Sequence, residues 1–414
     1  MSGPAATNRG VCLVGHKPAA PTTMNQNRFL TAVALAFFST QSSSLMLAPL
    51  LVDIAAEFDV SVAVAGQVAT ATFAAWAVSV VSVGPLSDSL GRRPVALAGL
   101  SLLASGVLAS AVAPNLETLM VTRVVTGLGG GMIPPNGMAA VTEVISPPRR
   151  AQVVGGLIAF TTLSSVIGVP VVAVISDIGG WRLPFLVTGS LLGACLILNW
   201  FWFPRSATSG PRSFSFLSRY RTLLALRILR AILVVNFAQR IAYMAMFSYL
   251  ATYLINNYGI SVGAVALPLA FVGIGTVAGS YIGGLVADRT DRMLLVAGSA
   301  IAGGIAAVAL FSIDFPIWVV VGISTLSIAL LSIPWTVLIN VCTEVSGQSR
   351  ATGIGLLGVS NQTGAVGGAA LGGILLAASG FPGIGYLCLG TVACSAVVIA
   401  VFMRGAGVNA KLVL

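Results

Sequence analysis

Long apolar stretches separated by short polar loops run along almost the whole chain. The first three, residues 29–52, 60–87 and 94–116, contain no charged side chain. A helix that crosses the hydrocarbon core of a bilayer needs about 20 apolar residues. Charges and turn residues divide the rest into similar pieces: residues 118–142, 151–176, 183–204, 231–258, 262–287, 293–313, 315–343 and 351–403, the last broken at 380–383. The pattern predicts an all-α membrane protein with twelve transmembrane helices.

The composition agrees with a membrane protein and argues against a nucleic-acid partner. Of the residues, 57% are hydrophobic and 8% are charged, whereas a soluble domain has about 25% charged residues. The net charge is +10, but the basic residues lie in short loops between apolar stretches. A nucleic-acid-binding face would instead gather them on one domain surface. The partner of this chain is therefore a lipid bilayer.

The basic residues also predict the orientation of the chain. All of them except Arg123, Arg182 and Arg240 fall in the two tails or in alternate loops on one side. Basic loops stay in the cytoplasm. We therefore expect a multi-pass protein of a bacterial inner or plasma membrane with both termini in the cytoplasm.

The spans divide the chain into two halves joined by a basic linker. In that linker, short apolar runs with arginines predict a short helix at the membrane surface. Either Met1 or Met24 starts the protein. The expected parts are a disordered cytoplasmic tail (1–27), an N-terminal six-helix bundle (28–204), a cytoplasmic linker (205–229), a C-terminal six-helix bundle (230–403) and a cytoplasmic tail (404–414).

The two halves repeat one another at an offset of 200 positions. The loop after the second span recurs, with Gly84, Asp88 and Arg92 matched by Gly284, Asp288 and Arg292. Further matches in the same register are Ser61 with Ser261, Pro134 with Pro334, Arg150 with Arg350 and Gly168 with Gly368. These matches indicate a duplication. In transporters built this way, the substrate site lies between the repeats near the bilayer midplane.

Residues 84–93, Gly-Pro-Leu-Ser-Asp-Ser-Leu-Gly-Arg-Arg, resemble the signature loop of the major facilitator superfamily. The resemblance extends over essentially the whole chain after Met24. It implies two pseudo-symmetric six-helix bundles related by an axis along the membrane normal. It also implies transport by alternating access, in which the bundles rock around a central site.

The resemblance gives the signature loop the role of a latch on the cytoplasmic side. Asp88 would lie near the start of the eleventh helix and pair with an arginine, because a carboxylate is favoured at both places. The alternative is a loop that only sets topology. In the second copy Asp291 replaces the signature glycine. The expected latch residues are Gly84, Asp88, Gly91, Arg92, Arg93, Gly284, Asp288 and Arg292.

Arg123 begins a stretch, Arg-Val-Val-Thr-Gly-Leu-Gly-Gly-Gly, that resembles the fourth-helix motif linked to proton coupling in exporters of this superfamily. An arginine inside a span costs about 2.5–3.5 kcal/mol on insertion scales, so it needs a partner. We expect Asp53 or Glu117 as that partner, and both as candidate proton carriers beside Asp88. The alternative is a purely structural arginine.

Two other carboxylates lie near the cytoplasmic ends of spans. We expect Glu143 to pair with Arg149 or Arg150, and Glu344 with Arg350, its neighbour in sequence.

The fifth span resembles the glycine-rich antiporter helix of the superfamily. It contains Gly155-Gly156 and Gly168-Val169-Pro170, where Val169 interrupts the family's Gly-Pro pair. This form is similar to the drug, sugar and nucleoside exporters. Gly168 and Pro170 are the predicted hinge, and the alternative is a helix that is merely kinked.

Arg240 lies near the middle of the seventh span, which lines the central cavity in the superfamily. Tyr243 and Phe247 follow at helical spacing, so the three residues share one face. This group suits an anionic or π-rich substrate. The alternative is an arginine with an internal partner or one that is bonded to the backbone. Because no Asp or Glu lies near the middle of any span, we expect a neutral or anionic substrate.

No sequence motif for an enzyme, nucleotide or metal appears. The chain lacks Walker and HExxH motifs, and its five cysteines have no metal-like spacing. We predict a monomeric secondary transporter without cofactors, most consistent with proton-coupled efflux of a neutral or anionic drug, sugar, nucleoside or other metabolite. The alternatives are an uptake symporter or uniporter for an organic anion and, more remotely, a membrane sensor.

Overall fold

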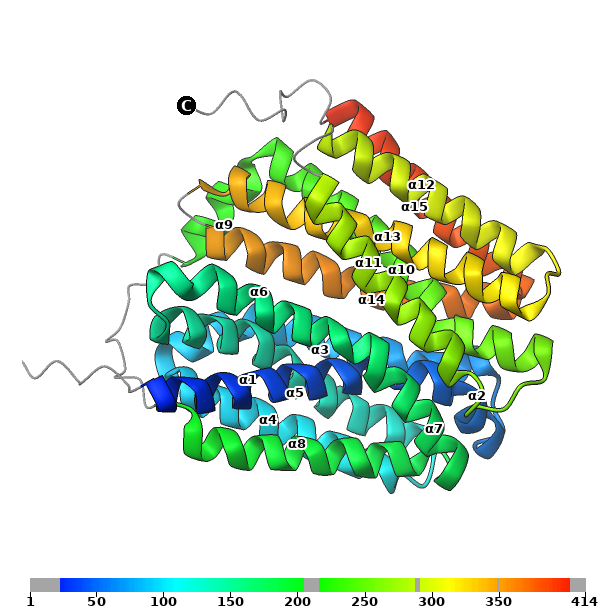
Figure 1. Ribbon diagram of the computed structural model, residues 1–414, viewed down its shortest axis with the longest axis horizontal. Coiled ribbons are helices and arrows are strands. Elements are labelled where there is room, and N and C mark those ends of the chain that lie inside the picture. Colours follow the sequence, from blue (N-terminus) through cyan, green and yellow to red (C-terminus); the bar gives the residue numbers. More distant parts are fainter. Residues whose placement is uncertain (1–22, 205–215, 287–290, 348–349, 403–414) are drawn as a thin grey trace, which may run out of the picture.

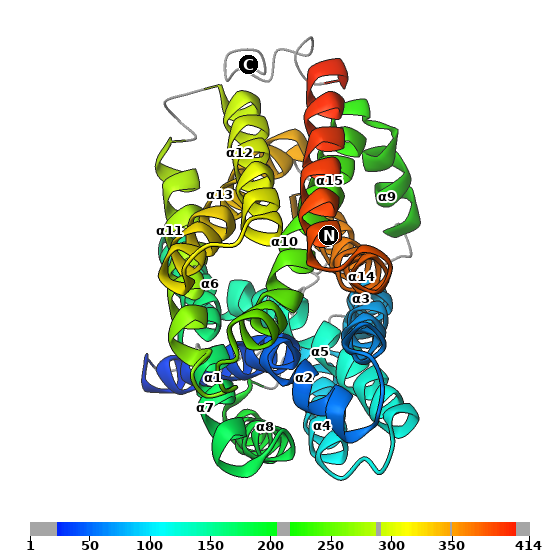
Figure 2. The ribbon, with the colours of Figure 1, turned by 90° about the vertical axis from the view of Figure 1, so that its right-hand side faces the viewer.

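The computed structural model describes residues 23–204, 216–286, 291–347 and 350–402, and every regular element in these ranges is a helix (Figure 1). The lower layer in Figure 1 holds the first half: α1 (Thr23–Leu45), α2 (Leu47–Glu57), α3 (Val62–Leu90), α4 (Arg92–Ala111), α5 (Leu116–Val144), α6 (Pro147–Leu163), the π-helical η1 (Ser164–Gly168), α7 (Val169–Gly179) and α8 (Arg182–Trp202). The upper layer holds α10 (Arg227–Tyr258), α11 (Ala266–Val286), α12 (Arg292–Ser312), α13 (Ile317–Val345), α14 (Arg350–Ser379) and α15 (Phe381–Phe402). Figure 2 shows the same two groups from one end.

Ten helices of the described residues are long and apolar enough to cross a membrane, and the pair α1–α2, bent by 43°, makes eleven. Pro49 explains the bend, because its ring would clash with the carbonyl of Leu45, the last residue of α1. The remaining long helix is α5, whose Arg123 and glycines lower its hydropathy. Since α1 begins and α15 ends at the same end of the molecule (Figure 1), the number of crossings is even, which is consistent with the predicted twelve.

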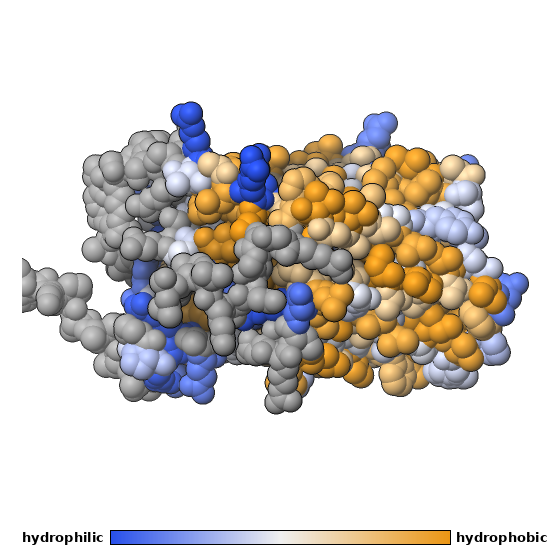
Figure 3. Space-filling model, turned by 90° about the horizontal axis from the view of Figure 1, so that it is seen from above, coloured by the Kyte–Doolittle hydropathy of each residue, from blue (hydrophilic) through white to orange (hydrophobic). Residues whose placement is uncertain are grey.

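The two ends of the molecule differ in charge. The end on the left of Figure 1, called the basic end below, carries the α3–α4 loop with Arg92 and Arg93 and the start of α10. The opposite end, called the far end, carries α2 and α7. Seen from above, hydrophilic residues gather at the basic end, and hydrophobic residues cover most of the remaining visible surface (Figure 3). An apolar surface of this extent is unfavourable in water and suits lipid.

A short helix, α9 (Phe216–Ala225), lies in the segment expected to link the halves. Its residue Leu223 is buried in a cluster with Leu229 and Ile232 of α10. The helix is thereby held against the C-terminal bundle at the basic end. Residues 23–27 of the expected N-terminal tail belong to α1, whereas residues 1–22, the expected C-terminal tail and Asp288 lie outside the described residues.

Glycines let helices within each bundle approach backbone to backbone. A Cβ atom at Gly127 of α5 would lie 2.2 Å from the carbonyl oxygen of Thr72, and one at Gly129 would lie 2.4 Å from the backbone nitrogen of Leu103. In the second half, a Cβ at Gly279 of α11 would lie 2.0 Å from the carbonyl oxygen of Ala329. The glycine-rich α5 is therefore wedged between α3 and α4, as its sequence suggests.

Two close contacts join the bundles in the half of the molecule nearer the far end. A Cβ at Gly66 of α3 would lie 2.3 Å from the hydroxyl oxygen of Tyr249 on α10. A Cβ at Gly273 of α11 would lie 2.3 Å from the carbonyl oxygen of Ser165 in η1. By contrast, Gly155 and Gly156, in the basic half of α6, face open space. The bundles are therefore tightly packed at the far end.

Substitution of Gly91 tests the turn between α3 and α4. Its φ of 93° and ψ of 155° belong to a region that only glycine adopts without strain. We expect Gly91→Ala to destabilise the protein by about 1–3 kcal/mol, measured as a lower melting temperature in detergent. Gly298→Ala is the control, since Gly298 is helical and a Cβ there meets nothing within 4 Å. Equal melting temperatures for the two variants would contradict the argument.

Candidate functional site

A cavity of about 320 Å³ lies between the two bundles. Its walls come from α1, α5, α6, η1 and, across the interface, α10, α11, α13 and α14. The repeated prolines Pro134 and Pro334 both line it. Its side chains are apolar or neutral and polar with one exception, Arg240, and no acidic residue is among the lining residues. Among the described residues that line it, the cavity therefore has a single positive charge.

Arg240 is held in place without an acidic partner. Its guanidinium carbon lies 4.7 Å from the centre of the Tyr243 ring, a cation–π contact. Its Nε atom is buried and has no hydrogen-bond partner within the part of the chain that the structure describes. Gly364 of α14 leaves room for this arrangement, because a Cβ there would lie 2.8 Å from the Cβ of Arg240. The internal partner considered as an alternative is absent from the described residues.

The two aromatic residues that follow Arg240 have different positions. Tyr243 lines the cavity, and its hydroxyl lies 3.2 Å from Oγ1 of Thr276 on α11. Phe247 is 2% exposed and does not line the cavity. Its ring stacks on Tyr243 with the centroids 6.0 Å apart. Phe247 therefore supports Tyr243 from behind.

Several polar residues that line the cavity belong to no recognisable sequence motif, and they were not predicted from the sequence. Gln239 and Asn361 line the cavity, and each has a buried side-chain carbonyl oxygen without a partner among the described residues. Two features of the sequence could have indicated them: the amide side chain of Gln239 next to Arg240 in one span, and the pair Asn361-Gln362 within another. Polar residues inside spans usually face the protein interior, but this rule alone does not identify the cavity.

Arg123 lies away from the cavity, fully buried in the N-terminal bundle at 0% exposure. Its Nε donates to Oγ1 of Thr72 over 3.2 Å, and one terminal nitrogen donates to the carbonyl oxygen of Ser43 over 2.9 Å. Its guanidinium carbon lies 5.6 Å from the ring centre of Phe185. Since carbonyls in the last turn of a helix lack partners within that helix, Arg123 satisfies one of them where α1 ends.

Neither expected carboxylate is the partner of Arg123, so that expectation was wrong. Glu117 is exposed in the first turn of α5, where a negative charge is favoured by the helix dipole. Asp53 is partly buried on α2 and accepts a hydrogen bond from Ser176 of α7 over 3.3 Å. The neighbouring Asp177 accepts the backbone N–H of Gly263, from the other bundle, over 3.1 Å. Asp53 therefore lies beside the contact between bundles at the far end.

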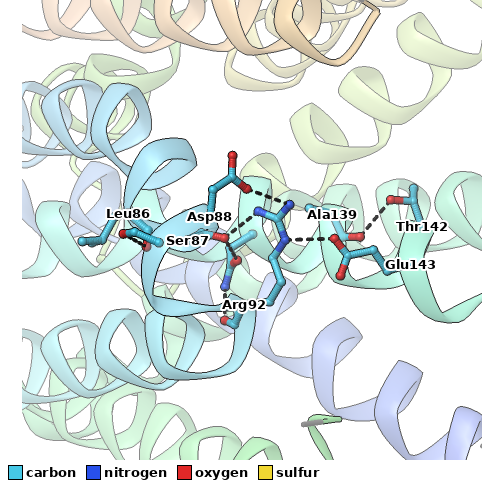
Figure 4. Close-up of polar contacts among 9 residues, drawn as sticks. Leu86, Ser87, Asp88, Arg92, Ala139, Thr142 and Glu143 are labelled. Carbon is cyan, nitrogen blue, oxygen red and sulfur yellow. Dashed lines mark hydrogen bonds and ion pairs between the residues drawn. The ribbon is translucent and has the colours of Figure 1, made fainter. Parts of the chain in front are cut away.

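The signature loop forms a charged network inside the first bundle (Figure 4). Arg92 lies 3.1 Å from Asp88 and 3.2 Å from Glu143, and it donates to Oγ of Ser87 over 2.6 Å. Ser87 in turn donates to Asn136 over 2.8 Å, and Asn136 donates to the carbonyl of Arg92 over 2.6 Å. One carboxylate oxygen of Asp88 points away from Arg92 in Figure 4. Among the described residues no hydrogen bond or ion pair joins Asp88 to α14.

The expected pairing of Glu143 with Arg149 or Arg150 was wrong, whereas the side chain of Arg350, the expected partner of Glu344, lies outside the described residues. Glu143 pairs with Arg92, and Glu344 accepts two hydrogen bonds from Arg292, over 2.8 and 2.7 Å. The helices explain this, because α4 begins and α5 ends at the basic end, as α12 begins and α13 ends there. Arg150 instead donates to the carbonyl of Ile145.

The other predicted latch residues lie at helix starts or within helices. Asp291 caps α12 by accepting the backbone N–H groups of Met293 and Leu294 over 3.0 and 3.2 Å, which accounts for aspartate where the first copy has Gly91. Arg93 donates to the backbone of Trp200 at the end of α8. Gly84 lies within α3 and Gly284 within α11.

The predicted hinge coincides with a π-helical turn. Residues Ser164–Gly168 form η1, and Pro170 follows in the first turn of α7. A Cβ at Gly168 would lie 2.4 Å from Oγ of Ser42, so α1 passes close to this turn. Short π-helical turns occur often at functional sites, and Ser164 and Ser165 of this turn line the cavity.

Comparison with known proteins identifies the family. A sequence model described as Major Facilitator Superfamily matches residues 33–351. The chain belongs to this superfamily. Among its relatives, the uncharacterized MFS-type transporter YwfA of Bacillus subtilis is 25% identical over 364 residues, covering 86% of this chain and 87% of YwfA. The inner membrane transport protein YdhP of Escherichia coli K12 is 27% identical over 271 residues, 64% of this chain and 68% of YdhP.

A solved structure has the same fold. A bacterial homologue of the human lysosomal transporter Spinster, in an inward-facing and unoccupied conformation, matches with a TM-score of 0.75 and 18% identity over 92% of this chain and 96% of that one. The protein is therefore a membrane transporter of the superfamily with its fold.

The Arg92–Glu143 pair can be measured by a double-mutant cycle. We expect Arg92→Gln and Glu143→Gln to show a coupling of about 0.5–1 kcal/mol in the free energy of unfolding, because the pair is only partly buried. Glu143→Gln combined with the control Arg149→Gln should be additive. Coupling to Arg149 instead would support the pairing expected from sequence.

Proposed function

We propose that the protein is a proton-coupled exporter of neutral or anionic small molecules, working by alternating access. The observation that carries the proposal is the cavity between the bundles, where Arg240 is the one charged lining residue. A cavity with one cation and no carboxylate disfavours organic cations, because the substrate charge would be buried without a counter-charge. The halves expected at 28–204 and 230–403 would rock as two bodies around it.

The proposed orientation places the basic end in the cytoplasm of a bacterial inner membrane. It rests on the distribution of arginines and on the similarity to YdhP, described as an inner membrane transport protein. In that orientation, the tight contacts of Gly66 and Gly273 close the outer side. This agrees with the inward-facing conformation of the Spinster homologue. A monomer suffices, since one chain forms the cavity.

Asp88 and Asp53 have different proposed roles. The free oxygen of Asp88 is available to the other bundle when the cytoplasmic side closes, and Gly84, Gly91 and Arg92 shape that loop as a latch. Asp53 is our first candidate for the proton carrier, because it is partly buried and lies beside the Asp177–Gly263 contact that opening must break.

Proton movement tests the proposal directly. The purified protein is reconstituted in vesicles with an internal pH dye, and neutral, anionic and cationic compounds are added. We expect a substrate-dependent pH change from neutral or anionic compounds that is lost in Asp88→Asn. The control is Asp59→Asn, an exposed loop position with φ of 52° that asparagine tolerates. Substrate flux without a pH change would favour a uniporter, and transport restricted to cations would overturn the substrate class.

The proton carrier is tested by a pair of variants. We expect Asp53→Asn to abolish the substrate-dependent pH change while substrate binding persists, because the carboxylate lies away from the cavity. Glu117→Gln should retain most of the pH change, since Glu117 is exposed at a helix start. The reverse result would move the proton site to Glu117.

A further inference from the structure

The cavity contains several polar atoms that lack partners. Nε of Arg240, Oε1 of Gln239, Oδ1 of Asn361 and Oγ of Ser164 are all buried without a hydrogen bond among the described residues, and all four residues line the cavity. A buried unpaired polar group costs about 1–3 kcal/mol. These are four of the ten such atoms among the described residues, and because they surround one cavity they point to a ligand that supplies the missing partners.

The amide side chains are oriented by contacts that leave their oxygens free. Gln239 is 4% exposed and donates its amide nitrogen to Oγ of Ser395 over 3.0 Å, which fixes its oxygen as an unused acceptor. Asn361 donates to Oε1 of Gln362 over 3.3 Å, which likewise leaves Oδ1 unused. Acceptors of this kind need O–H or N–H donors, and small rotations about the broad terminal torsions suffice to present them.

Arg240 needs a ligand that accepts hydrogen bonds. Its guanidinium offers only donors, in a planar fork that fits a carboxylate in two-point contact. The ring of Tyr243 holds one face of this fork. Because no second cation lines the cavity, a dianion such as a phosphate monoester would keep an uncompensated charge. Because no carboxylate lines it, an amine or zwitterion would do the same.

We infer that the cavity binds a compact monoanionic carboxylate that also carries an O–H or N–H donor. The carboxylate binds Arg240, and the donor binds the free oxygen of Gln239 or of Asn361. The volume of about 320 Å³ lies at the small end of ligand pockets, and Phe37, Tyr243 and Trp335 supply apolar walls that suit a ring. This assignment rests on the proposed transport function, since it names the substrate class of the same site.

The test uses four ring compounds of similar size: 4-hydroxybenzoate, 4-methoxybenzoate, 4-hydroxybenzamide and tyramine. Binding of each to the full chain in lipid nanodiscs is measured by equilibrium dialysis without a proton gradient. We expect 4-hydroxybenzoate to bind about tenfold or more tightly than the amide and the amine, and about fivefold more tightly than its methyl ether. If 4-hydroxybenzoate binds no better than its neutral or cationic counterpart, or does not bind, the inference is overturned.

Variants assign the contacts. Arg240→Gln should weaken 4-hydroxybenzoate about tenfold and leave 4-hydroxybenzamide nearly unchanged, whereas Arg240→Lys should retain part of the preference. Asn361→Leu and Gln239→Leu should reduce the difference between the hydroxy and methoxy acids. Arg230→Gln, an exposed position on the same helix, is the control. An unchanged carboxylate preference in Arg240→Gln would overturn the assignment.

Two further outcomes separate this inference from the proposed function. Melting temperature and monodispersity identify a variant that fails to fold, and Arg240→Lys then carries the comparison with wild type. Carboxylate binding without a pH change in vesicles would leave the substrate class standing and remove proton coupling. Proton-coupled transport of neutral compounds, with no carboxylate preference in nanodiscs, would do the reverse.

Discussion

The N-terminal bundle depends on one buried arginine. A polar group in a bilayer must find its partner inside the protein, because no water is available there. The α1–α2 bend leaves the carbonyl of Ser43 without its usual partner, and Arg123 supplies one while also binding Thr72 and contacting Phe185. Arg123 therefore satisfies a carbonyl that the bend leaves unpaired. Four helices, α1, α3, α5 and α8, meet at this side chain, which positions α1 where it lines the cavity.

The repeated halves solve the same geometric problems, partly with the same residue types and partly with different ones. Arg92–Glu143 and Arg292–Glu344 join corresponding helix ends at the basic end. The turn before α4 uses a glycine with positive φ, whereas the turn before α12 uses Asp291 as a helix cap. The close packing of the second and fourth spans comes from glycines of α5 in one half and of α11 in the other. The contacts are therefore more alike between halves than the residues that make them.

The sequence predicted the fold well and the site only in part, for identifiable reasons. The length of each span and the internal repeat can be read from local sequence patterns. These patterns predicted the helices and the position of Arg240 near the middle of a span. The partner of Glu143 depends on which helix ends meet in space, and proximity in sequence favoured the wrong arginine. A carboxylate was expected as the partner of Arg123. The actual partner is a backbone carbonyl that a helix bend leaves unpaired, and the pattern of charged residues in the sequence does not reveal such a carbonyl. Gln239 and Asn361 come from different spans, which pack together at Gly364 and at further glycines of α14.

Alternating access, on the proposed mechanism, exchanges contacts at one end for contacts at the other. Contacts at the far end include Gly66 against Tyr249, Gly273 against Ser165 and the hydrogen bond from Gly263 to Asp177. These contacts involve little charge, so their loss on opening costs mainly packing. At the basic end, Asp88 keeps an oxygen directed away from Arg92 (Figure 4), so closure there gains a charged contact.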